Sequence, residues 1–190
     1  MPPAARRRVS PEDRQDELLD ATVRVFERHE FQDVNVTAIA KEAGISMGLL
    51  YHYYPDCQAL FVAAFERLAR NVVRACLAGA NGDGFRFVRS SLEAYFDYAT
   101  RHPATVRVIL RPARVAAGLE GMNDQLNEQM ATLLTRVLSL DSGDVNAAVG
   151  LRAWLAYVDA SILAMLSGTP LERERFTATA LRVLRAAASS

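Results

Sequence analysis

The sequence has little of what marks several large protein classes. Its 190 residues include only two cysteines, Cys57 and Cys76, which form neither a disulfide framework nor a metal-ligand pattern and favour a reducing, cytoplasmic setting. No uninterrupted apolar run approaches the roughly 18 residues that a membrane-spanning helix needs. The start of the chain carries Arg6, Arg7 and Arg8 without an apolar stretch behind them, so we expect no signal peptide and no membrane partner.

Features of the common enzyme classes are also scarce. The three histidines, His29, His52 and His102, are scattered, with no metal-ligand spacing and no pairing to a cysteine nucleophile. Gly82 and Gly84 stand in a turn that lacks the flanking strand of a phosphate-binding loop. We therefore expect no enzyme, no cofactor and no metal, and we keep an all-α enzyme only as an alternative.

Helix signals fill the chain. Hydrophobic residues make up 51% of it, and they recur every three or four positions, as they do along one face of an α-helix. Proline, glycine and asparagine clusters interrupt this pattern, most clearly at 81–84. The sequence predicts an all-α fold of about nine helices, at about 11–28, 36–43, 46–53, 57–78, 85–101, 104–110, 119–137, 151–165 and 176–187.

The first helices carry clear start and stop signals. Ser10, Asn35, Ser46 and Asp56 each precede an apolar periodic segment and can cap it, and Gly44 suits the left-handed position that ends a helix. Two short helices joined at such a glycine and braced by a longer helix have the form of a helix-turn-helix. Periodicity alone leaves an ordinary helical hairpin equally open.

A wider pattern decides between these interpretations. Several separated elements of the sequence agree with one another in type and spacing. They are Arg14, Leu18-Leu19-Asp20-Ala21, Phe26, Phe31, the run 36–54 (VTAIAKEAGISMGLLYHYY) and Leu60. Together they closely resemble the DNA-binding domain of the tetracycline-repressor (TetR) family. The resemblance covers about residues 14–65, a third of the chain. It implies an N-terminal arm and three-helix DNA-binding domain over 1–55 and a larger helical regulatory and dimerisation domain over 56–190, joined by the helix 57–78.

The resemblance also implies a function. Members are homodimeric, sequence-specific transcription factors, usually repressors, and many are released from a palindromic operator on double-stranded DNA by a small molecule. Carried over residue by residue, the DNA-facing positions are Thr37, Ser46, Met47, Gly48, Leu49, Tyr51, His52 and Tyr53. A DNA-binding dimer without small-molecule control is the alternative, and activation in place of repression stays open.

The sequence departs from the family pattern in ways that affect DNA binding. The family commonly has Gly, Thr and Lys where Glu30, Leu49 and Cys57 stand, so one turn and one phosphate contact are altered. Residues 1–60 contain seven basic and ten acidic side chains, and phosphate neutralisation supplies most non-specific affinity. We expect few phosphate contacts, with the arginine arm at 6–8 either reaching DNA or staying solvated.

The remaining helices suggest a ligand pocket and a dimer interface. An apolar or aromatic effector is expected, although the same side chains suit a plain core; the candidates are Tyr95, Phe96, Tyr98, His102, Arg107, Ile109, Arg111, Met122, Leu126, Trp154 and Tyr157. The last two helices are expected to pair with their copies in a four-helix bundle, unless they pack only within one subunit; the seams are Leu151, Leu155, Val158, Ile162, Met165 and Phe176, Ala180, Val183, Leu184, Ala187.

Overall fold

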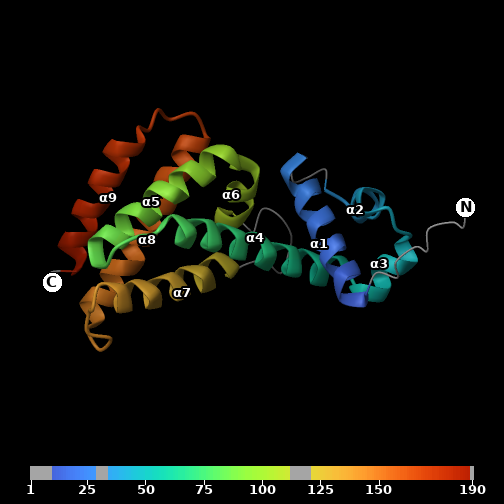
Figure 1. Cartoon of the computed structure of the whole chain (residues 1–190), viewed down its shortest axis with the longest axis horizontal. Helices are drawn as coiled ribbons and strands as arrows, with labels where there is room; N and C mark the ends of the chain where they lie inside the picture. Colours follow the sequence, from blue (N-terminus) through green and yellow to red (C-terminus); the bar gives the residue numbers. More distant parts are fainter. Residues whose placement is uncertain (1–9, 29–33, 112–120, 189–190) are drawn as a thin grey trace, which may run out of the picture.

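The computed structural model describes residues 10–28, 34–111 and 121–188, and over these residues the chain forms α-helices and no strand (Figure 1). The expectation of an all-α fold is confirmed. The helices are α1 Pro11–Arg28, α2 Val36–Ala43, α3 Met47–Tyr53, α4 Cys57–Gly79, α5 Gly84–Arg101, α6 Pro103–Leu110, α7 Met122–Val137, α8 Val145–Leu166 and α9 Arg173–Ala188. The arginine arm at 6–8 and the positions Glu30, Phe31, Pro112 and Leu119 lie outside the described residues.

Helices α1 to α3 form one end of the molecule, and α4 runs from them into the bundle of α5 to α9 at the other end (Figure 1). The first apolar core joins Phe26 of α1, Ile39 of α2 and Leu50 of α3 to the first half of α4, at Leu60 and Leu68. Because half of α4 is buried in this core, the linking helix is also part of the N-terminal unit. Helix α6 completes the core with Val108 and Ile109.

The second core lies between α5, α8 and α9. Its centre is α8, where Leu151, Trp154, Val158 and Ile162 are all buried. The indole nitrogen of Trp154 donates a hydrogen bond of 2.7 Å to the carbonyl oxygen of Ala180 in α9. This bond satisfies the only polar atom of the indole, so that the ring can lie in an apolar interior.

Helix α8 corrects the expectation about membrane helices. Its 22 residues include an 18-residue window with a mean hydropathy of 1.4, which is long and apolar enough to cross a membrane by length and composition alone. The expectation failed because Arg152 and Asp159 interrupt the run without lowering its mean hydropathy far. The structure gives the apolar character another explanation, since α8 packs against α5, α6, α7 and α9.

Apolar side chains cover two sides of α8, and this changes the predicted dimer seam. Most of the predicted seam residues are buried inside the subunit: Leu151, Leu155, Val158 and Ile162 of α8, and Phe176, Ala180 and Leu184 of α9. They cannot also meet a second copy, so that part of the seam is wrong. A different face is exposed on the last two helices, made of Val145, Val149, Ala153, Ala156 and Ala160 of α8 and Val183 and Ala186 of α9.

Candidate functional site

The helix-turn-helix is held by short-range bonds that its sequence specifies. Asn35 Oδ1 accepts a hydrogen bond of 2.9 Å from the backbone N–H of Ala38, and Ser46 Oγ accepts one of 3.2 Å from that of Leu49. Gly44 ends α2 with φ 64°, a left-handed conformation that favours glycine. These bonds fix where α2 ends and α3 begins, and therefore fix how the two helices cross.

The buried side of the pair determines its exposed side. Ile39, Ala40 and Leu50 have at most 4% of their surface exposed and anchor α2 and α3 on the first core. The opposite side presents Thr37, Ser46, Gly48, Leu49, Tyr51 and His52 to solvent, while Met47 and Tyr53 are half-buried at its border. We call these eight residues the recognition surface. Tyr51 and Leu49 are 44% and 36% exposed, which is unusual for large apolar side chains.

Individual groups on the recognition surface are arranged for contact with a partner. A Cβ atom added to Gly48 would meet only Ser46 Oγ, at 3.9 Å, so the backbone there faces open space. A hydrogen bond with the side chain of Cys57 raises the pKa of Tyr51. The rings of His52 and Tyr53 lie 5.4 Å apart, edge to face.

The acidic residues of this end are largely tied into ion pairs. Glu42 lies 2.8 Å from Arg24 Nε and 3.1 Å from Arg28 Nη1. Arg67 of α4 bridges two carboxylates of α1, with 2.7 Å to Asp16 and 2.8 Å to Asp20. These pairs lower the negative charge that a polyanion would meet.

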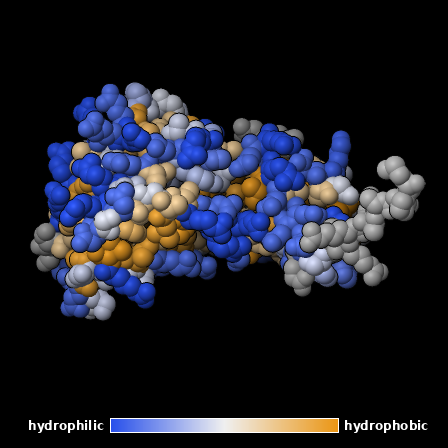
Figure 2. Space-filling view, in the orientation of Figure 1, coloured by the Kyte–Doolittle hydropathy of each residue, from blue (hydrophilic) through white to orange (hydrophobic). Residues whose placement is uncertain are grey.

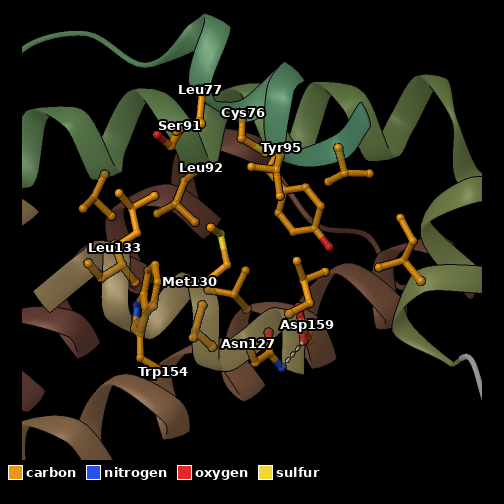
Figure 3. A pocket seen from close by; sticks show the side chains of 18 of the residues that line it. Cys76, Leu77, Ser91, Leu92, Tyr95, Asn127, Met130, Leu133, Trp154 and Asp159 are labelled. Atoms are coloured by element: carbon orange, nitrogen blue, oxygen red, sulfur yellow. Dashed lines mark hydrogen bonds between the residues drawn. The ribbon is translucent and has the colours of Figure 1, made fainter. Parts of the chain in front are cut away.

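A cavity lies between α4, α5, α7 and α8, with α6 closing one end. Its volume is about 130 Å³ and its wall is almost wholly apolar. Figure 3 shows the ring of Tyr95 reaching in from α5, with its hydroxyl oxygen directed toward the side where Asp159 and Asn127 lie. Trp154 and Met130 line the opposite part of the wall. The cavity is thus an apolar chamber with one polar end.

The family profile described as "Bacterial regulatory proteins, tetR family" matches residues 18–64. This range begins in α1 and ends in the first half of α4, so it covers much of the first core, but not the part that α6 contributes. Residues 18–64 therefore form a TetR-family DNA-binding domain. Proteins of this family are DNA-binding regulators, and the enzyme alternative is set aside on this ground.

Curated relatives agree with this assignment. The chain is 29% identical over 110 residues to the HTH-type transcriptional regulator EthR of Mycolicibacterium smegmatis. The matched segment covers 55% of this chain and 51% of EthR. It is 27% identical over 132 residues to the HTH-type transcriptional repressor KstR of the same species, covering 67% of the chain and 64% of KstR. The matches therefore span about half to two thirds of these relatives.

The likeness in fold extends over nearly the whole chain. A tetR-family transcriptional regulator from Streptomyces coelicolor superposes with a TM-score of 0.76, at 21% identity, over 95% of this chain and 81% of the other. At this identity the comparison establishes the fold alone, and it shows that both parts of the chain, not only the helix-turn-helix, share the helical arrangement of that protein.

Only some of the predicted pocket residues line the cavity. Tyr95, Ile109, Leu126 and Trp154 do. The others lie elsewhere. Phe96 packs on Phe176, with ring centroids 5.8 Å apart, and Tyr98 stacks on His102, with ring centroids 4.5 Å apart. Arg107 donates a hydrogen bond to the carbonyl oxygen of Leu166, and Arg111 is exposed at the end of α6. Met122 lies in an outer groove, and Tyr157 lines a hollow beside Leu171.

The sequence interpretation missed the polar end of the cavity. Asp159 accepts hydrogen bonds from Asn127, at 3.2 Å, and from Asn123, at 3.5 Å. Burial raises the pKa of Asp159, and these two bonds oppose the shift. A lone carboxylate within an apolar helix, opposite two asparagines four residues apart, was a signal that could have been followed.

Two helices connect the cavity with the helix-turn-helix. Helix α4 contributes Leu60 and Leu68 to the first core and Cys76 to the cavity wall. Helix α6 lines the cavity with Ile109, and its Thr105 donates a hydrogen bond of 2.8 Å to Glu27 of α1. A change in cavity size therefore has two direct mechanical routes to the first core.

Proposed function

We propose that the protein is a dimeric transcriptional repressor in the cytoplasm that binds a palindromic DNA operator and is released from it by a small molecule. The recognition surface carries this proposal. Its polar and aromatic side chains stand outward on α3 because Leu50 and Ile39 anchor the other side of the pair. An α-helix presented in this way matches the width of a DNA major groove.

The recognition surface offers the chemistry that base edges and phosphates require. Ser46, Tyr51 and Tyr53 bring hydroxyls, His52 brings an imidazole, and Leu49 can meet a thymine methyl group. Gly48 lets the helix backbone approach the groove closely. With Cys57 at the start of α4 there is no lysine for the phosphate, and backbone N–H groups of that helix end take its place.

Dimerisation supplies the second recognition surface. The exposed face of α8 and α9 carries Val145 at 73% and Val149 at 58% exposure, next to alanines that permit close helix packing. A long apolar face on two neighbouring helices is costly in water and becomes stable when a second copy covers it. We therefore assign the dimer interface to this outer face. In this division residues 1–55 bind DNA and 56–190 bind ligand and partner.

Ligand binding changes the spacing of the two recognition surfaces in this mechanism. The cavity holds about 130 Å³, so an occupant that exceeds this volume must separate α4 from α7 and α8. Because the first half of α4 belongs to the first core, such a movement carries the helix-turn-helix with it. The ligand must prefer one arrangement of α4 to act as an inducer.

The experiment is selection of duplexes from a random DNA library by the full chain, followed by affinity measurement on the enriched sequence. We expect a near-palindrome with half-sites about 34 Å apart, or a multiple of that distance. The slope of log affinity against log salt should be shallower than the value of about ten found for a strongly basic repressor. Failure to enrich any sequence would contradict the proposal.

Gly48→Ala is the matched variant for this experiment. An added methyl group meets no protein atom closer than 3.9 Å, and alanine favours a helix by about 1 kcal/mol over glycine. We expect the variant to be as stable as the parent or more stable, yet to bind the selected duplex at least tenfold more weakly. Unchanged affinity would place α3 away from the groove.

A further inference from the structure

The cavity is strongly asymmetric in its chemistry. Leucine, valine, methionine and aromatic side chains form most of the wall, and the polar groups gather where Asp159 of α8 meets Asn123 and Asn127 of α7. The asparagine amide groups donate to the same carboxylate oxygen, Oδ2. Among the residues that the structure describes, no arginine, lysine or histidine forms an ion pair with Asp159, so this negative charge has no cationic neighbour there.

One polar atom at this end is an acceptor without a partner. Asn123 Oδ1 is buried and accepts no hydrogen bond from any described residue. A buried acceptor left in this state costs free energy. Together with the carboxylate of Asp159 it forms a site without positive charge.

We propose that the cavity binds a small organic amine, as its ammonium form, with an apolar body of about one aromatic ring. This inference rests on the proposed function, because it names the effector of that mechanism. The ammonium group supplies a positive charge to Asp159 and donors to Asn123 Oδ1. The apolar body lies along Met130 and Trp154, in a volume close to that of cavities known to hold benzene.

Charge decides between this ligand class and its competitors. A carboxylate-bearing ligand would place a second negative charge beside Asp159 in a region of low dielectric, where repulsion is strong. A neutral hydrocarbon would leave the carboxylate without a counter-charge and Asn123 Oδ1 without a donor. An ammonium group supplies both, which is why the amine is the occupant that we expect.

An outer hollow lies beside the cavity, between α4 and α7. It shares Val73, Leu77 and Leu126 with the cavity wall. Apolar side chains gather at this part of the surface (Figure 2).

The test uses the full chain without DNA. Trp154 is the only tryptophan in the sequence and lines the cavity, so its fluorescence reports on occupancy, with calorimetry as a second readout. The probes are 2-phenylethylamine, its neutral counterpart 2-phenylethanol and the anion 3-phenylpropionate. We expect the amine to bind at least tenfold more tightly than the alcohol, and the anion to bind weakest. Equal or tighter binding of the alcohol or the anion would overturn the proposal.

Variants locate the site. Asp159→Asn keeps the shape of the side chain, so it should weaken amine binding at least tenfold and leave alcohol binding within a factor of two. Asp159→Ser serves in its place should the first variant fold poorly. Asp97→Asn is the matched control, because Asp97 pairs with Arg173 on the outside of the bundle, at 3.0 Å, and should not alter amine binding. Unchanged amine affinity in both Asp159 variants would overturn the assignment.

The two proposals fail separately. Amine binding is measured without DNA, so its absence leaves operator binding intact and removes only the ligand class. If the chain binds the amine at Asp159 but enriches no DNA sequence, the ligand site stands and the proposed repressor function is contradicted.

Discussion

The recognition surface and the cavity are built by different physical rules, although α4 takes part in both regions. The recognition surface depends on bonds between neighbours in sequence, such as the Ser46 and Asn35 caps, and on a filled core beneath it. The cavity brings together residues as distant in sequence as Val72 and Asp159 and leaves space between them. A filled core presents side chains outward, whereas an incompletely filled one can take a ligand in and respond to it.

Matched leucine truncations should separate the two regions most strongly. Leu60 is completely buried in the first core, and Leu60→Ala should lower the free energy of unfolding by about 2–5 kcal/mol. Leu126 is half-buried and already borders empty space, so it has fewer contacts to lose. Leu126→Ala should cost less than about half as much in denaturant unfolding. Equal losses would mean that the cavity is closed in solution.

Each region also contains one cysteine, and their reactivities should differ by at least about 100-fold. Burial raises the pKa of Cys76, in the cavity wall, from 9.0 to about 12, so roughly one thiol in ten thousand is ionised at pH 8. By surface area both cysteines are partly exposed, but Cys57 lies at the start of α4 whereas Cys76 borders the apolar cavity. Labelling of Cys57→Ser and Cys76→Ser with a maleimide, followed by mass spectrometry, measures each thiol alone. Similar rates would show that Cys76 is open to solvent.

Asp159 should make the cavity region sensitive to pH. Burial raises its pKa above that of the unfolded chain, so its contribution to stability is complete below the unfolded pKa near 4 and is lost as pH rises through the folded pKa. Asp159→Asn cannot ionise and should be more stable than the parent at pH 7, by about 0.5–2 kcal/mol. The advantage should shrink as the pH falls toward 4 in thermal melts. A constant difference would contradict this account.

A carboxylate outside the bundle should have the smallest effect. Asp97 and Arg173 are both about half exposed, and pairs of this kind contribute roughly 0.2–1 kcal/mol. Asp97→Asn should therefore lower stability by no more than about 1 kcal/mol, an effect that salt reduces. A loss of several kcal/mol would show that this pair, and not only the apolar core, holds α9 to α5.

The fold could be predicted from the sequence because its helix ends are marked locally. The serine, asparagine and aspartate caps and Gly44 act within four residues, and the structure contains each of them. The helical spacing of apolar residues likewise predicted the lengths of α1 to α6. The DNA-facing positions of α3 were instead carried over from the resemblance to the TetR family, and in the structure its one buried residue, Leu50, orients the helix.

The interior of the larger region could not be predicted in this way. Helix α8 is apolar on two sides, so its sequence does not say which side faces the subunit and which faces a partner. The predicted pocket residues were chosen by type, yet Phe96 and Tyr98 turn toward Phe176 and His102. The polar end at Asp159 depends on the register between α7 and α8, which long-range packing sets.

The central claim is that the surface around Tyr51 and His52 contacts the bases of an operator. The most direct test is the affinity of the parent and of the double variant Tyr51→Ala, His52→Ala for the selected duplex, by fluorescence anisotropy, with helix content and melting temperature checked by circular dichroism. Both side chains are exposed, so the account predicts an unchanged fold and a loss of at least about 100-fold in specific affinity. A double variant that still protects its operator at the parent's concentration would contradict it.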